Sequence, residues 1–260
     1  MPFTFAHPAA VLPLRRHLWF PGLAAGSIAP DVAYYLPVPG GADGTHSVVG
    51  LVGIDLLLGF LLLALWHVFR TPLLALSSAG WRSRVTPPNL AIPTWRAAVT
   101  AVLSLVVGAA THIAWDTFTH TDGIAVRHWD LLRVSIVGPH RLYNVIGYVS
   151  SLGGLLLLAA VTLGWYRGTP PRAHRWPVLR GRSWVLVGIV AAAVVGAVVA
   201  LADPVSRVST YDWVRRLLVG TTQGAGLALT LYVLCWHLRL TPRLDVPDIG
   251  ARGGEYPPSP

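Results

Sequence analysis

Five apolar runs constrain the fold of this 260-residue chain more than any other feature. A helix needs about 20 apolar residues to cross the hydrocarbon core of a bilayer. The five runs are close to this length and lie at about residues 47–69, 97–115, 145–166, 184–202 and 217–237. Charged residues make up only 12% of the chain, whereas soluble domains contain about 25%. The sequence therefore predicts an all-α integral membrane helical bundle with about five transmembrane helices in residues 47–240.

The two ends of the chain differ from these runs. Residues 1–46 contain no apolar stretch of 18 residues, and Arg15, Arg16 and His17 interrupt the most apolar part. Because a signal peptide places its charges before the apolar region, we interpret 1–46 as an ordered extramembrane or interfacial segment. Residues 241–260 are rich in Pro and Gly, and we predict a disordered tail there.

The basic residues indicate how the helices are oriented. The net charge is +9, but the Arg residues are scattered between apolar runs and form no patch of the kind that binds nucleic acid. The loops 70–96 and 167–183 contain Arg and no acidic residue, so the positive-inside rule places them in the cytoplasm. We therefore predict a multi-pass protein of the bacterial cytoplasmic membrane, with 1–46 and 116–144 on the extracytoplasmic face.

Three ionisable residues end the second apolar run, in the stretch THIAWDTFTHTDG at 111–123. His112, Asp116 and His120 are four residues apart, which places them on one face of a helix. An i, i+4 pair of this kind resembles the HExxH arrangement, in which one helix supplies two metal ligands. The alternative is that His112 and Asp116 hydrogen-bond to each other as an interfacial helix cap. Ionisable residues at membrane depth are costly and usually functional.

The N-terminal segment contains three more potential ligands in short motifs: FAHP, GSIAPD and GTHS. The predicted topology brings them to the same membrane face as the helical stripe. Histidine nitrogen and carboxylate oxygen are ligands that zinc accepts. We therefore predict a site for a divalent metal such as zinc, formed by His7, Asp31, His46, His112, Asp116 and His120. Taken singly, Asp31 fits a turn or helix-cap residue equally well, and His7 and His46 fit surface histidines.

Asp55 is a separate acidic residue inside the first apolar run. Nine residues at about 100° per residue separate it from His46, so on one continuous helix the two would face opposite ways. We therefore do not include Asp55 among the ligands. It could instead pair with another span, for which Gln223 is a candidate, or line an ion or proton path.

Four motifs, in the same order and with similar spacing, resemble an uncharacterised bacterial membrane family, domain-of-unknown-function family 4184. They are MPFTFAHPAAVLPL, GSIAPD, THSVVGLVGID and HIAWDTFTHTDG, and the resemblance covers at least residues 1–160. More distantly, the layout is similar to membrane-bound metal-dependent hydrolases, which themselves resemble zinc-dependent phospholipase C. That resemblance implies that His7, Asp31, His46, His112 and Asp116 are metal ligands. The chain lacks the second HxxxE or HxxxD pair that a multi-metal centre would need.

These observations lead to one functional hypothesis and two alternatives. The hypothesis is a metal-dependent hydrolase that acts on a lipid or phosphate-ester substrate at the outer membrane interface, with membrane lipid as its partner. A metal-activated water would be the nucleophile, and Asp116 or Asp31 the catalytic base. The alternatives are a non-enzymatic membrane protein with a structural polar or metal cluster, and a small transporter with Asp55 and Gln223 along its path. The sequence does not indicate an oligomeric state.

Overall fold

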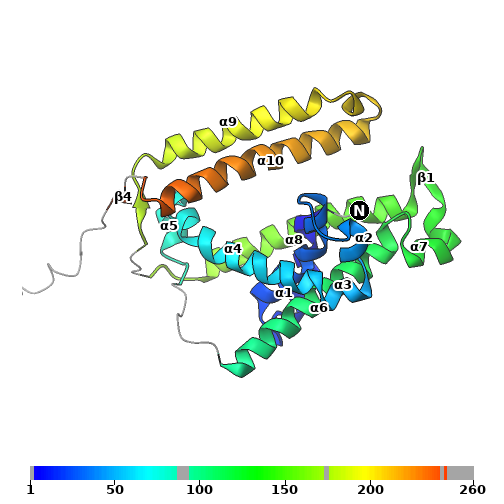
Figure 1. Ribbon diagram of the computed structural model, residues 1–260, viewed down its shortest axis with the longest axis horizontal. Coiled ribbons are helices and arrows are strands. Elements are labelled where there is room, and N and C mark those ends of the chain that lie inside the picture. The colour runs from blue at the N-terminus through cyan, green and yellow to red at the C-terminus, as the bar shows by residue number, and fades with distance from the viewer. Residues whose placement is uncertain (1–2, 87–93, 173–175, 241–242, 245–260) are drawn as a thin grey trace, which may run out of the picture. The chain divides into compact units, whose positions relative to one another are not determined.

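The computed structural model describes residues 3–86, 94–172, 176–240 and 243–244. Within these residues the fold is almost entirely α-helical, and five helices are long and apolar enough to cross a membrane, as predicted. They are α4 (Ile54–Leu76), α6 (Trp95–Thr119), α8 (Leu142–Gly168), α9 (Arg182–Leu201) and α10 (Thr210–His237) (Figure 1). Few of their side chains are buried within the protein, which suits helices that face hydrocarbon.

The chain divides into two compact units. The first comprises residues 1–66 and 88–169, and the second comprises residues 67–87 and 170–260. All six predicted ligands belong to the first unit.

The first apolar run forms two helices where the sequence suggested one. The first is a short helix, α3 (Val48–Val52). Its N-cap is Ser47, whose side chain accepts a hydrogen bond from the backbone N–H of Gly50. It ends at Gly53, whose φ of −108° and ψ of −97° lie outside the helical region. The main helix α4 therefore begins at Ile54 and continues to Leu76.

In the first unit, α1 (Phe20–Ile28) lies along the middle of α6 in very close contact. A Cβ atom at Gly26 would lie 2.1 Å from the carbonyl oxygen of Leu105, and one at Gly108 would lie 2.3 Å from that of Leu23. The backbone N–H of Trp19 also donates to Ser104 Oγ at 3.0 Å. The N-terminal segment is thus packed against a membrane-spanning helix, as small residues permit in helix pairs of membrane proteins.

Short elements of the first unit complete the frame around α6. The segment η1 (Thr4–Ala9) packs against α8, where the N–H of Phe3 donates to Ser151 Oγ at 2.8 Å. After α6, the chain forms a small buried cluster of Ala125, Val126, Leu132 and Tyr143. The remaining elements of this unit are η2 (Leu12–Arg16), η3 (Ala29–Tyr34), α2 (Gly41–Thr45), α7 (Ile124–His128), η4 (Asp130–Arg133) and the antiparallel pair β1 (Ser135–Val137) and β2 (His140–Arg141).

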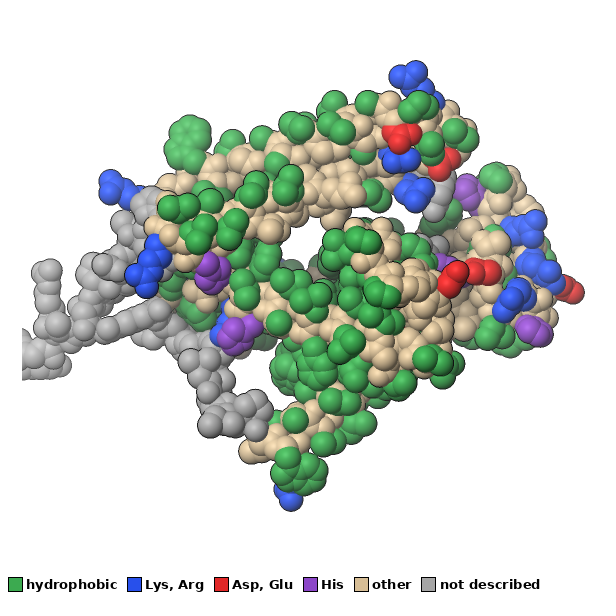
Figure 2. Space-filling model, viewed as in Figure 1, with side chains coloured by type: hydrophobic (Ala, Val, Ile, Leu, Met, Phe, Trp, Pro, Cys, Tyr) green, Lys and Arg blue, Asp and Glu red, His purple; other side chains and the backbone are tan. Residues whose placement is uncertain are grey.

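The second unit is built on a tight helical hairpin of α9 and α10. A Cβ atom at Gly220 would lie 2.3 Å from the carbonyl oxygen of Gly196, and one at Gly224 would lie 2.1 Å from that of Ala192. Apolar side chains cover the outer surface of this hairpin (Figure 2). The core of the second unit contains Ala75, Leu76, Leu179, Tyr232, Val233 and Trp236.

Pro72 lies inside α4 without ending the helix. Proline has no N–H, so the carbonyl four residues earlier loses its helical donor. That carbonyl belongs to Val68, and it accepts a hydrogen bond from His237 Nε2 at 3.1 Å. The carbonyl of Pro72 accepts another from the Tyr232 hydroxyl at 3.0 Å. Two side chains of α10 thus satisfy the backbone at the proline.

The second unit also contains α5 (Ala79–Arg82), η5 (Pro204–Arg207) and two short antiparallel strands, β3 (Val178–Leu179) and β4 (Arg243–Leu244). Within the predicted tail at 241–260, β4 is the part that the structure describes, and the remaining residues lie outside it.

Candidate metal centre

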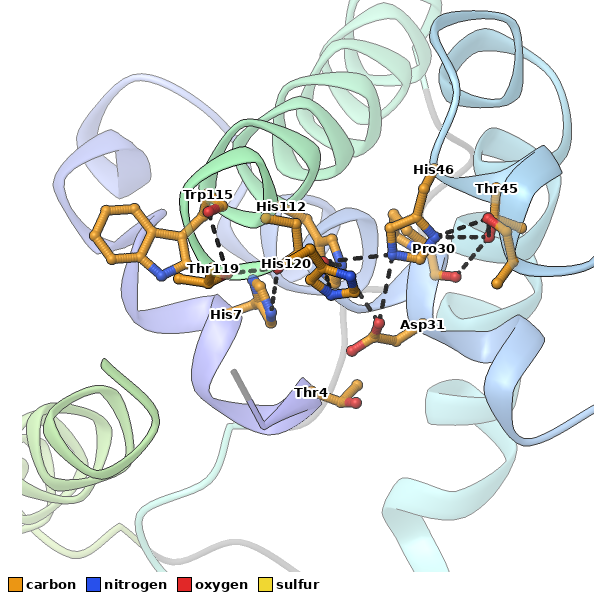
Figure 3. Close-up of polar contacts among 12 residues, drawn as sticks. Thr4, His7, Pro30, Asp31, Thr45, His46, His112, Trp115, Thr119 and His120 are labelled. Carbon is orange, nitrogen blue, oxygen red and sulfur yellow. Dashed lines mark hydrogen bonds and ion pairs between the residues drawn. The ribbon is translucent and has the colours of Figure 1, made fainter. Parts of the chain in front are cut away.

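The structure brings the six predicted ligands together in one buried cluster (Figure 3). They come from four parts of the first unit. His7 lies on η1, Asp31 on η3, His46 directly after α2, and His112 and Asp116 on α6, whereas His120 is the C-cap of that helix. The close contact between α1 and α6 positions η3, since η3 follows α1 without a break.

The helix α6 carries His112 and Asp116 on one face, as the sequence predicted. His112 and Asp116 are one turn apart, and His112 Nε2 lies 3.3 Å from Asp116 Oδ2. The helix ends at Thr119, yet the N–H of His120 still donates to the carbonyl of Asp116. The His120 ring turns back over the cluster, with Nε2 3.1 Å from Asp116 Oδ2.

The four central side chains, Asp31, His46, His112 and Asp116, each offer one ligand atom within 4.8 Å of the others. Two ligands bound tetrahedrally at about 2.1 Å from an ion would lie about 3.4 Å apart. His112 Nε2 lies 3.4 Å from Asp31 Oδ1 and 3.3 Å from Asp116 Oδ2, and His46 Nε2 lies 3.6 Å and 3.5 Å from the same two oxygens. This group could bind one metal ion.

Backbone carbonyls orient the two central histidines. Nδ1 of His112 lies 2.8 Å from the carbonyl oxygen of Ser27, and Nδ1 of His46 lies 3.0 Å from that of Ala42. A carbonyl can only accept, so in both rings Nδ1 carries the proton. In the neutral ring Nε2 then has a free lone pair that faces the carboxylates. A hydrogen bond from the other ring nitrogen to a backbone carbonyl is typical of metal-bound histidines.

Many polar atoms at the centre of the cluster have no hydrogen-bond partner among the described residues. They are His7 Nε2, both carboxylate oxygens of Asp31, His46 Nε2, His112 Nε2, Asp116 Oδ2 and His120 Nε2. An unpaired buried polar group costs free energy, and an unpaired buried charge costs more. A cation at the centre would satisfy the atoms of Asp31, His46, His112 and Asp116 together, so these four residues fit a divalent metal.

The electrostatics of the cluster depend on how each group faces the carboxylates. Burial alone would lower the pKa of His46, but the adjacent Asp116 and Asp31 outweigh burial and raise the pKa to about 9. Burial raises the pKa of Asp31, but His112 and His46 overcome it and hold this pKa well below its usual range. His7 differs, because burial and the stacked His112 ring lower its pKa to about 4.

The cluster is closed on one side and open on the other. The side chains of Asp31 and His112 are fully buried, and those of His7 and Asp116 are 2% and 6% exposed. His46 and His120 are 16% and 20% exposed. These two histidines therefore lie on the side of the cluster that is nearest to solvent.

Asp55 lies outside the cluster but close to it. It is 1% exposed, and neither carboxylate oxygen has a hydrogen-bond partner among the described residues. It lies one turn before Gly59, which packs against Leu105 of α6, and it interacts electrostatically with His46 and His112. Gln223, the partner suggested from the sequence, belongs to the second unit.

Sequence reasoning did not identify the groups that support the ligands. These are the carbonyls of Ser27 and Ala42 and the hydroxyl of Thr119, which donates to Asp116 Oδ1 at 3.4 Å. A backbone carbonyl leaves no signal in the sequence. The spacing of Ser104 and Gly108 before His112 was a usable signal, because it continues the same helix face toward α1.

Comparisons with known proteins agree with the motifs in the N-terminal half and extend the match further along the chain. No curated protein and no solved structure matches the chain. A family model described as "Domain of unknown function (DUF4184)" matches residues 1–234, which include all six residues of the cluster, four of the long apolar helices and most of α10. The chain therefore belongs to the domain-of-unknown-function family 4184.

Proposed function

We propose that this membrane protein is a metal-dependent hydrolase that acts on a lipid or phosphate-ester substrate at the extracytoplasmic membrane face. The observation that supports the proposal best is the set of buried ligand atoms around one centre that have no hydrogen-bond partner among the described residues. The four distances between the histidine Nε2 atoms and the carboxylate oxygens fit the edge of a tetrahedral site. The other ring nitrogen of both His46 and His112 donates to a backbone carbonyl. Imidazole and carboxylate ligands together suit zinc.

In this proposal Asp31, His46, His112 and Asp116 hold the ion, and His7 and His120 complete its surroundings. When bound, a divalent ion supplies Lewis acidity and lowers the pKa of a water molecule toward neutrality. Asp31 and Asp116, which the sequence suggested as catalytic bases, lie deep in the cluster, and their positions favour coordination. Their role as bases stays a prediction.

His120 is better placed to move a proton. Its Nε2 lies 3.1 Å from Asp116 Oδ2, and its Nδ1 lies 3.8 Å from Asp122 Oδ1. The Asp122 side chain is 84% exposed. His120 therefore lies between the buried centre and a carboxylate in contact with solvent, and in this proposal it acts as the general acid or base.

The partial exposure of His46 and His120 supports a catalytic centre over a purely structural one in this proposal. A structural site has its coordination closed by protein groups, whereas a catalytic site keeps an open position. Asp31, His46, His112 and Asp116 would fill a tetrahedral shell, so in this proposal water binds as a fifth ligand, on the side where His46 and His120 are partly exposed. The predicted topology would place it at the extracytoplasmic face, where reporter fusions to the N-terminus and to the loop after α6 would test it.

Metal analysis of the detergent-purified full chain tests the proposal directly. We expect a stoichiometric divalent ion in the wild type and its loss in His112→Ala and in Asp116→Ala. The substitution His128→Ala serves as a matched control, since this exposed histidine lies on α7 outside the cluster. A wild type without bound metal, or retention of the metal in both site variants, would refute the metal centre. A metal-loaded protein that hydrolyses no phosphate ester would leave a structural centre.

A further inference from the structure

An apolar slot lies beside the metal centre, between η1, α6 and α8. Its volume is about 310 Å³. One wall is His7, which the slot shares with the candidate metal centre. The other lining residues include Ala6, Ala10, Trp115, Gly153 and Leu157.

Small residues create this slot. Gly154 of α8 approaches η1 so closely that a Cβ atom there would lie 3.0 Å from the carbonyl oxygen of Ala6. Its neighbour Gly153 faces open space, with no atom within 4 Å of an added Cβ. The indole N–H of Trp115 donates to Ser150 Oγ at 3.3 Å, so these two polar groups of the wall are paired with each other. A slot of this kind offers a water molecule few partners.

The setting of the slot indicates what fills it. The helix α8 is apolar along its length, and few of its side chains are buried within the protein. In a bilayer the slot therefore opens to hydrocarbon. A methylene group occupies about as much volume as a water molecule, roughly 30 Å³, so the slot has room for about ten carbon atoms of a chain.

The slot meets the candidate metal centre at His7. His7 stacks on His112, with ring centroids 3.8 Å apart, and His7 Nε2 lies 3.9 Å from Asp116 Oδ1. A hydrocarbon chain in the slot would therefore place its polar head group beside the cluster. A second hollow, lined by Arg15, Arg16 and His17, adjoins the slot at Ala9 and Leu157, and it provides a place for control substitutions.

We propose that this slot binds one hydrocarbon chain of a membrane lipid whose phosphate-ester head group lies at the metal centre. The inference rests on the proposed function for the chemistry of the head group, and it selects a lipid over a water-soluble phosphate ester. The chain supplies the binding energy through apolar contact, while the metal ligands and His120 act on the head group.

Photo-cross-linking tests the slot. The full chain is reconstituted in phosphatidylcholine vesicles that contain a small fraction of phosphatidic acid with a diazirine on its acyl chain. After irradiation, mass spectrometry of peptides locates the label. We expect cross-links in residues 6–10 and 150–157 of the wild type. Gly153→Leu should fill the slot and reduce this labelling by roughly tenfold, the change that about 1.4 kcal/mol of binding free energy produces.

Matched variants control for folding and for general contact with lipid. Gly164→Leu makes the same change on α8, where an added Cβ also meets no atom within 4 Å, and it should keep the labelling of the wild type, as should Arg16→Ala. Ala10→Leu fills the slot from the opposite wall and should repeat the loss. Equal labelling of Gly153→Leu, Ala10→Leu and the wild type would overturn the inference.

Metal content, measured on the same samples, separates the two proposals. Gly153→Leu and Gly164→Leu should both retain the metal of the wild type. A wild type that lacks metal but shows labelling sensitive to Gly153→Leu would refute the hydrolase and retain the chain-binding slot. A wild type that binds metal but labels equally in all variants would refute the slot alone.

Discussion

For the proposed metal centre, the contact between α1 and α6 makes metal affinity depend on Gly108, which supplies no ligand atom and lies one turn before His112 on α6. Adding one methyl group in Gly108→Ala would place Cβ 2.3 Å from the carbonyl oxygen of Leu23 and 2.8 Å from the N–H nitrogen of Ser27. Contacts of a Cβ shorter than 3.0 Å essentially never occur, so α1 must move away from α6 by at least about 0.7 Å, because cores yield by small backbone shifts.

That movement changes the hydrogen bond between His112 and the backbone of Ser27. Its Nδ1 lies 2.8 Å from the carbonyl oxygen of Ser27, the residue that the new methyl group displaces. Taken along the hydrogen bond, the shift would lengthen it to about 3.5 Å, beyond the usual range of N–H···O bonds. Loss of a hydrogen-bond partner of a metal-bound histidine lowers metal affinity by about 10–100-fold. We therefore expect Gly108→Ala to bind zinc about 10–100-fold more weakly than the wild type.

The assay is competition for zinc against a chelator of known affinity, on detergent-purified protein that elutes as a single species. Gly164→Ala is the control, since an added Cβ there meets no atom within 4 Å. In a helix, Gly→Ala alone stabilises by up to about 1 kcal/mol, so a loss at Gly108 cannot come from helix propensity. If Gly108→Ala and Gly164→Ala bind zinc with the same affinity, α1 does not position His112 as we argue.

Three further predictions concern other parts of the molecule. The pKa of His46 is raised from 6.5 to about 9, so its contribution to the stability of the metal-free protein is complete below pH 6.5 and is lost as pH rises through 9. Thermal unfolding of chelator-treated protein should show this fall in stability. Calorimetry in buffers of different ionisation enthalpy should show that protons are released when zinc binds at pH 7.5. His237→Phe removes the donor to the Val68 carbonyl and should reduce the unfolding free energy by about 1 kcal/mol, whereas an unchanged value would show that water satisfies this carbonyl. Gly220→Leu would press on the Gly196 carbonyl and should destabilise the protein by about 1–3 kcal/mol with unchanged metal content, because the ligands all lie in the other unit.

The sequence was sufficient for the long helices, because their apolar runs are close to the length that a bilayer requires. Two local departures have identifiable causes. Gly53 interrupts the first run, so α4 begins at Ile54. Pro72 would be expected to end the helix, but α4 continues through it because His237 and Tyr232 bond the backbone there. Such compensation depends on residues about 160 positions away, which no local pattern can reveal.

That the six candidate residues lie close together could also be predicted from residue types and spacing, but the geometry of the cluster could not. His120 is the last residue of its stripe, and a helix that ends before it could turn its ring away. The helix does end at Thr119, yet the His120 ring returns to Asp116. The packing of α1 along α6 depends on backbone approach at Gly26 and Gly108, and a glycine in a sequence does not state what will occupy the space it leaves.

One face of α6 joins this packing to the chemistry. Ser104, Gly108, His112, Asp116 and His120 follow at intervals of four, so they form one continuous stripe. The first two hold α1 against the helix, and the last three surround the metal centre. Because α1 leads directly into η3 and Asp31, the same contact delivers a ligand from the N-terminal segment to the ligands on the helix. A slip of one residue between α1 and α6 would therefore remove both the close packing and the four-ligand geometry, which explains why a short N-terminal helix is packed so tightly against a membrane-spanning one.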